Sequence, residues 1–193
     1  MTKPAGASEE QCKEVTMYGV LEGDGKMFQV GEYVVYGSNG VCKVEEIGPL
    51  KIGGMKDDRI YYFLLPLYSN GSRLYTPVDN QKVVIRAVIS REEADELLED
   101  IDSIETIPGE NGKNRDNVYK DFLKSYNCRD MLRIIKTVDR KKKARIAEGK
   151  HLVVNDERYL KIAKDCLFGE LAIPLEKRPD EVEEMIRIRF LVE

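Results

Sequence analysis

Short apolar runs separated by turn residues occupy the first half of the chain. Residues 33–36 and 41–47 flank Gly37-Ser38-Asn39-Gly40, an arrangement typical of a β-hairpin. Three later runs, at residues 59–67, 73–77 and 83–89, are rich enough in aromatic and aliphatic side chains to form strands. Five short strands within about 60 residues predict a small, strongly bent antiparallel barrel.

The apolar pattern changes its period from two to 3.6 at Ser90. Ser90 and Glu93 have the spacing of a capping box, which marks the start of a helix. Apolar stripes predict further helices within residues 118–126, 131–138, 155–167 and 182–190. The sequence therefore predicts an α+β protein, with a five-stranded antiparallel barrel over residues 27–89 and a bundle of about five helices over residues 90–193.

Residues 1–26 differ in composition from the rest of the chain. They are rich in Gly, Ala, Ser, Glu and Lys and contain few apolar side chains. Such a segment cannot bury enough apolar surface to fold, so a flexible N-terminal extension is predicted. Met27 is an alternative natural start of the folded protein.

Charge is distributed unevenly along the 193 residues. The formal net charge is only −4, and 42% of the residues are hydrophobic, which is enough for a substantial core. Residues 90–112 contain nine Asp and Glu and one Arg, whereas residues 113–150 contain thirteen Lys and Arg and five Asp and Glu. A chain that is acidic overall therefore includes a strongly basic segment.

The basic segment includes a predicted amphipathic helix. At 100° per residue, the apolar side chains of residues 131–138 share one face. The opposite face and the residues that follow carry Arg133, Lys136, Arg140, Lys141, Lys142, Lys143 and Arg145. We expect these cations to be exposed, either as a hydrated surface or as a site for DNA phosphates. Because no helix-turn-helix or zinc-finger pattern is present, contacts to the DNA backbone are favoured over base reading.

The sequence offers little for catalysis or metal binding. The four cysteines are far apart and lack the spacing of a metal site, and His151 is the only histidine. No phosphate-binding glycine loop joins a strand to a helix. We therefore expect no enzyme activity, no cofactor and no metal. No apolar run approaches the roughly 20 residues of a membrane span, so a cytoplasmic protein with free thiols is expected.

Three segments, from both predicted parts of the chain, are similar to those of a known family. They are Met27-Phe28-x-Val30-Gly31-Glu32-x-Val34-Val35-Tyr36 with Asn39-Gly40-Val41-x-x-Val44-Glu45-x-Ile47, then Pro77-x-x-Asn80 with Ile85-Arg86-x-Val88-Ile89-Ser90, and Gly169-Glu170-Leu171-Ala172. They resemble the two domains of the CarD/CdnL family of bacterial transcription regulators. The likeness extends from Met27 to the C-terminus.

The resemblance implies that residues 27–89 form a Tudor-like RNA polymerase-interaction domain that docks on the polymerase β subunit. In the family, the docking edge is built from the second and fourth strands, and the matching positions are Leu50, Lys51, Arg73 and Tyr75. The helical domain would contact promoter DNA at the upstream edge of the transcription bubble and modulate the stability of the open complex. We expect a monomer that does not contact membranes.

One departure from the family concerns a tryptophan. Family members carry a Trp at the start of a DNA-contacting helix, where it wedges into the minor groove, but this chain contains no Trp. Arg115 takes that position by spacing, and Lys120 matches a basic position of the same helix. The resemblance thus adds Arg115 and Lys120 to the expected DNA contacts. The alternative is an adaptor that binds the polymerase, or another protein, without contacting DNA.

Overall fold

The computed structural model describes residues 27–52, 55–68, 72–108 and 113–191. At residues 51–52, 55–58, 113–114 and 189–191 it describes the backbone alone. The predicted N-terminal extension, residues 1–26, lies outside the described residues.

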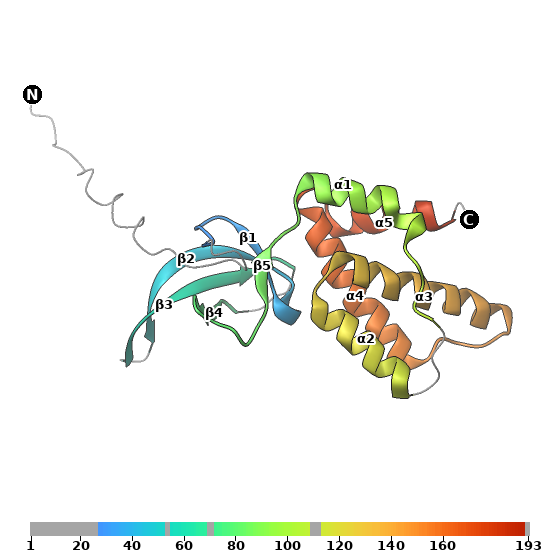
Figure 1. Ribbon diagram of the computed structural model, residues 1–193, viewed down its shortest axis with the longest axis horizontal. Helices are drawn as coiled ribbons and strands as arrows, with labels where there is room; N and C mark the ends of the chain where they lie inside the picture. Colours follow the sequence, from blue (N-terminus) through green and yellow to red (C-terminus); the bar gives the residue numbers. More distant parts are fainter. Residues whose placement is uncertain (1–26, 53–54, 69–71, 109–112, 192–193) are drawn as a thin grey trace, which may run out of the picture.

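The first half of the chain forms one antiparallel sheet. Its strands are β1 (Tyr33–Tyr36), β2 (Val41–Ile52), β3 (Met55–Pro66), β4 (Leu74–Pro77) and β5 (Ile85–Ala87), in the order β4-β3-β2-β1-β5 (Figure 1). A short 3-10 helix, η3 (Gly37–Asn39), joins β1 to β2. Gly37 and Gly40 both have positive φ in this turn, which explains why glycines flank it. The predicted five-stranded antiparallel unit is confirmed.

Strands β2 and β3 are longer than predicted. The sequence predicts that the second strand ends before Gly48-Pro49, which is wrong, because the ladder continues to Ile52 paired with Met55. A shift of register between Pro49 and Lys51 lets the strand pass a residue that has no N–H to donate. The result is a long curved ribbon that extends beyond the other strands (Figure 1).

The second half of the chain is helical. It contains α1 (Arg91–Glu99), the 3-10 helix η4 (Asp100–Ser103), α2 (Lys113–Ser125), α3 (Cys128–Ala147), α4 (Val154–Ala172) and α5 (Pro179–Leu191). The predicted capping box starts α1, with 3.1 Å between the Glu93 amide nitrogen and Ser90 Oγ and 2.7 Å between the Ser90 amide nitrogen and Glu93 Oε2. The predicted α+β class and helical bundle are confirmed.

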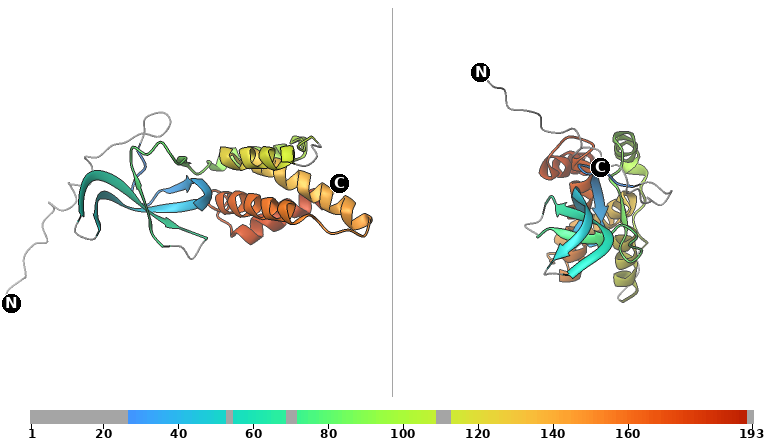
Figure 2. Two further views of the ribbon diagram at one scale, coloured as in Figure 1. Left: turned by 90° about the horizontal axis from the view of Figure 1, so that it is seen from below. Right: turned by 90° about the vertical axis from the view of Figure 1, so that its left-hand side faces the viewer.

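Two separate hydrophobic clusters lie in these two halves. One is formed between the strands and includes Val34, Val44 and Leu64. The other lies between the helices, where α3 packs on both α2 and α4. The sheet lies at one end of the molecule and the helices lie at the other (Figure 2).

Candidate functional site

Three aromatic side chains lie on the paired strands β3 and β4, at the β4 edge of the sheet. We define the aromatic strip as Tyr61, Phe63 and Tyr75. The rings of Phe63 and Tyr75 meet edge to face, with centroids 5.2 Å apart, and 41% of Tyr75 is exposed. The guanidinium of Arg59 lies 5.6 Å from the Tyr61 ring centroid. Tyr61 and Phe63 are buried, with 6% and 8% exposed, so Tyr75 is the exposed member of the strip. An exposed aromatic side chain beside charged groups is typical of protein interfaces.

The four expected polymerase contacts fall into two places. Arg73 and Tyr75 lie together, and Arg73 Nη2 lies 2.7 Å from Glu45 Oε2. Leu50 is half-buried and follows Pro49, which pairs with Ile60 beyond the last paired residue of β4. The side chain of Lys51 lies outside the described residues.

Two cations of α3 that were expected to face solvent, Arg133 and Lys136, are half-buried. The Arg133 guanidinium lies 4.9 Å from the ring centroid of Phe122 in α2. Lys136 Nζ donates to the carbonyl oxygens of Ile101 and Asp102, at 2.9 and 3.1 Å. Arg133 and Lys136 are therefore less exposed than expected. The reason is that α2 and η4 also pack against α3. A helical wheel drawn for α3 alone does not include these neighbours.

A buried carboxylate binds two further residues that were expected to contact DNA. Asp156, in the first turn of α4, is 0% exposed and lies between α2 and α3. Its Oδ1 is 3.2 Å from Arg115 Nη2, and Lys141 Nζ donates to its Oδ2. A buried charge requires such compensation, so Arg115 and Lys141 are structural partners of Asp156. Arg145 is also engaged within the helical unit, with its Nε 2.6 Å from the His151 carbonyl oxygen.

The remaining expected DNA contacts form the exposed cations, which we define as Lys120, Arg140, Lys142 and Lys143. Three of them lie in the second half of α3, beside a groove of about 640 Å³ between α3, α4 and α5. Apolar side chains of Ile135, Phe168 and Ile186 line this groove together with Asp139. The structure thus leaves a smaller basic surface than the sequence predicts.

Sequence reasoning missed several residues that shape these surfaces. Phe63 and Glu45 contact the expected polymerase residues, and Asp156 withdraws two cations from solvent. The alternation of side chains along a strand could have indicated which face of the sheet Phe63 occupies. Asp156 carried no such signal, because an acidic residue in the first turn of a helix is ordinary.

Among the described residues, no group of three or more His, Cys, Asp or Glu side chains is arranged to bind a metal ion. None of the described helices combines the length and the apolar character needed to cross a membrane.

A bent sheet with an aromatic edge, joined to helices with a basic surface, defines a protein of the interaction class. Residues 28–89 match the family model described as the CarD-like/TRCF RID domain, and this part of the chain belongs to that family. The predicted resemblance is confirmed for this Tudor-like domain. The match identifies an RNA polymerase-interacting, transcription-related protein, and the family is one of non-catalytic interaction domains. No curated protein matches the chain.

Proposed function

We propose that the protein is a non-catalytic transcription regulator that acts as a monomer. Residues 27–89 would bind the β subunit of RNA polymerase, and the helical residues 90–193 would contact upstream promoter DNA and modulate the stability of the open complex. The observation that carries this proposal is the RID family match of residues 28–89, joined to helices that present exposed cations.

The aromatic strip and Arg73 are the proposed polymerase contact. Tyr75 supplies a large, partly exposed ring that is already fixed by Phe63, so little side-chain entropy is lost when it becomes buried. Tyr75→Ala in the full chain should weaken binding to purified polymerase β by about ten-fold or more. Tyr33→Ala is the matched control, because Tyr33 has a similar exposed fraction, 37%, on another strand. Equal losses in both variants would refute this assignment.

The exposed cations are the proposed DNA contact. Because Arg115 pairs with Asp156, we propose that it does not replace the family's Trp wedge and that contacts to the DNA backbone predominate. Such contacts are weak alone, but docking on the polymerase would raise their effective concentration at the promoter.

The DNA contact can be tested with charge reversals outside the core. Arg140→Glu combined with Lys142→Glu should shorten the lifetime of polymerase–promoter complexes relative to the wild-type protein. Lys161→Glu combined with Lys177→Glu reverses two exposed lysines outside α3 and should have little effect. A wild-type lifetime with the first double variant would contradict a DNA contact through α3.

An adaptor without DNA contact is the second candidate. It is favoured by the intramolecular contacts of Arg115, Arg133, Lys136, Lys141 and Arg145. Salt-titrated binding to promoter DNA separates the two candidates, because a regulator should lose affinity as salt rises, whereas an adaptor should show no specific DNA binding at any salt concentration.

A further inference from the structure

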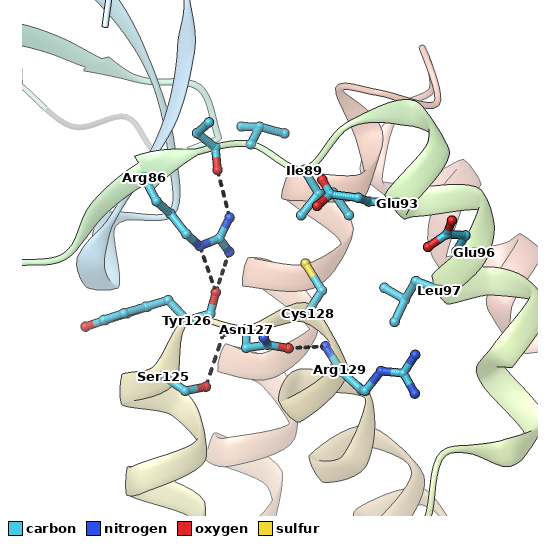
Figure 3. A pocket seen from close by; sticks show the side chains of 12 residues that line it. Arg86, Ile89, Glu93, Glu96, Leu97, Ser125, Tyr126, Asn127, Cys128 and Arg129 are labelled. Atoms are coloured by element: carbon cyan, nitrogen blue, oxygen red, sulfur yellow. Dashed lines mark hydrogen bonds between the residues drawn. The ribbon is translucent and has the colours of Figure 1, made fainter. Parts of the chain in front are cut away.

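A partly buried ion pair joins the strands to the helices. Arg86, in β5, extends toward the turn between α2 and α3 (Figure 3). Its two terminal nitrogens lie 2.5 and 2.8 Å from the two carboxylate oxygens of Glu170 in α4. Only 5% of the Glu170 side chain is exposed, so its charge depends on Arg86 for compensation.

Arg86 and Glu170 each bind a further group across the junction, by which we mean the contact between the sheet and the helices. Arg86 also donates to the carbonyl oxygen of Tyr126, which lies 3.2 Å from Nε (Figure 3). Glu170 accepts from the backbone N–H of Ile89, at 3.2 Å. Glu170 thus binds two points of the segment that leaves the sheet, and Arg86 binds two points of the helical unit. A planar, bidentate pair accepts few orientations, whereas an apolar contact can slide.

Two glycines near this pair lie against side chains, and the contacts of Gly169 with Tyr68 and of Gly37 with Tyr126 join the sheet to the helices. A Cβ atom at Gly169 would lie 3.0 Å from the Tyr68 ring, and one at Gly37 would lie 2.7 Å from Val83 and 3.6 Å from the Tyr126 hydroxyl. Tyr126 itself has a φ of 50°, which is uncommon for a residue with a side chain. The surroundings therefore hold the turn that presents the Tyr126 carbonyl to Arg86.

Beside the pair, the sheet and the helices leave an open space. A pocket of about 620 Å³ opens between residues 86–89, α1 and residues 125–129 (Figure 3). Glu93, Glu96 and Arg129 are among the polar side chains that line it. Apolar side chains, among them Ile89, also cross between the sheet and the helices, but the directional contacts on this side of the molecule are those of Arg86 and Glu170.

We propose that Arg86 and Glu170 are positioning residues that fix the orientation of the RID domain relative to the helices. Only the functional consequence of this proposal rests on the proposed function. If the orientation is fixed, a polymerase docked on the aromatic strip would hold the exposed cations at one place on the DNA. The orientation itself can be measured without polymerase or DNA.

Residual dipolar couplings of backbone amides in the full chain test the proposal, because they report whether two parts of a protein share one alignment. We expect one alignment tensor for the wild-type protein. Glu170→Gln keeps the shape of the side chain and removes its charge, and we expect different tensors for the sheet and the helices. Arg86→Lys keeps the charge and removes the planar fork, and the same result is expected.

Glu183→Gln is the matched control. It removes an ion pair with Lys164, at 2.8 Å, that lies wholly within the helical unit, so one shared tensor should remain. Arg86→Lys decides the question where Glu170→Gln fails to fold. The wild-type tensor, shared by both units in a folded variant of the pair, would overturn the proposal.

A second measurement separates this proposal from the proposed function. With the pair broken, binding to polymerase β should be unchanged, whereas the effect on promoter-complex lifetime should be lost. If the wild-type protein bound no polymerase, the proposed function would fail, but the dipolar couplings would still decide the role of Arg86 and Glu170.

Discussion

Two adjacent lysines of α3 have different environments. Lys141 donates to the buried carboxylate of Asp156, whereas Lys142 is exposed. Lys141→Glu would place two carboxylates together with only Arg115 to compensate them. We expect this change to lower the free energy of unfolding by about 3–5 kcal/mol, and Lys142→Glu to lower it by clearly less, because Lys142 is exposed. Urea unfolding measures both values, and equal stabilities would show that Lys141 makes no buried pair.

Asp139 should make stability depend on pH. Burial raises the pKa of its carboxyl above the ordinary 3.8, and Lys164, Lys142 and Lys143 offset this only in part, while Glu183 raises it further. The folded protein therefore binds this proton more tightly than the unfolded chain does. Its contribution to the free energy of unfolding must then decrease as pH rises through the range above the ordinary pKa.

Asp139→Asn removes this titration. Relative to the wild-type protein, we expect the variant to gain stability as the pH is raised from about 4 to about 7. Urea unfolding across this range provides the measurement. Asp165→Asn, which removes a carboxyl whose side chain is 68% exposed, is the control. The same slope for both variants would contradict an effect of burial at Asp139.

At the scale of the element, the start of α1 follows from local chemistry. The Ser90 hydroxyl accepts from the Glu93 amide, which has no partner within the helix. Ser90→Ala should lower the free energy of unfolding by about 1 kcal/mol, measured by urea unfolding. Ser103→Ala removes a hydroxyl that donates to the Asp100 carbonyl and does not cap α1, so a smaller loss is expected. A larger loss at Ser103 would refute the capping role.

Local patterns predicted the elements better than they predicted the surfaces. The capping box and the Gly37–Gly40 turn involve neighbours in sequence, so their residue types define them directly. The length of β2 depends on pairing with β3, and Gly48-Pro49 is tolerated only because a bulge can form there. Sequence periodicity contains no information about such a partner.

The basic surface shows even more clearly that sequence periodicity does not reveal packing partners. Periodicity correctly placed Met131 and Val138 on the buried side of α3. It could not indicate that Arg133 and Lys136 meet α2 and η4, or that Asp156 binds Lys141. Glu170 stands in an apolar stretch between Phe168 and Leu171, and a charged residue in such a stretch indicates an ion pair. Its partner Arg86 is 84 residues away, so the sequence could not identify it.

At the scale of the whole molecule, α3 connects the junction to the basic surface. The helix begins at Cys128, beside the pocket between residues 86–89, α1 and residues 125–129, and extends away from the sheet (Figure 1). Arg140 lies about 18 Å farther along it, at 1.5 Å per residue. A rigid junction would therefore determine where the exposed cations lie relative to a partner bound on the aromatic strip.

The number of exposed cations predicts how DNA binding by the full chain depends on salt. Each phosphate contact contributes about −0.9 to the slope of log K against log salt concentration, so four contacts give a slope of about −3.6. All nine cations expected from the sequence would give about −8. Fluorescence anisotropy with a promoter duplex between about 50 and 200 mM salt measures this slope. A value near −8 would mean that DNA releases Arg115 and Lys141 from Asp156, because only then could those buried pairs contribute phosphate contacts.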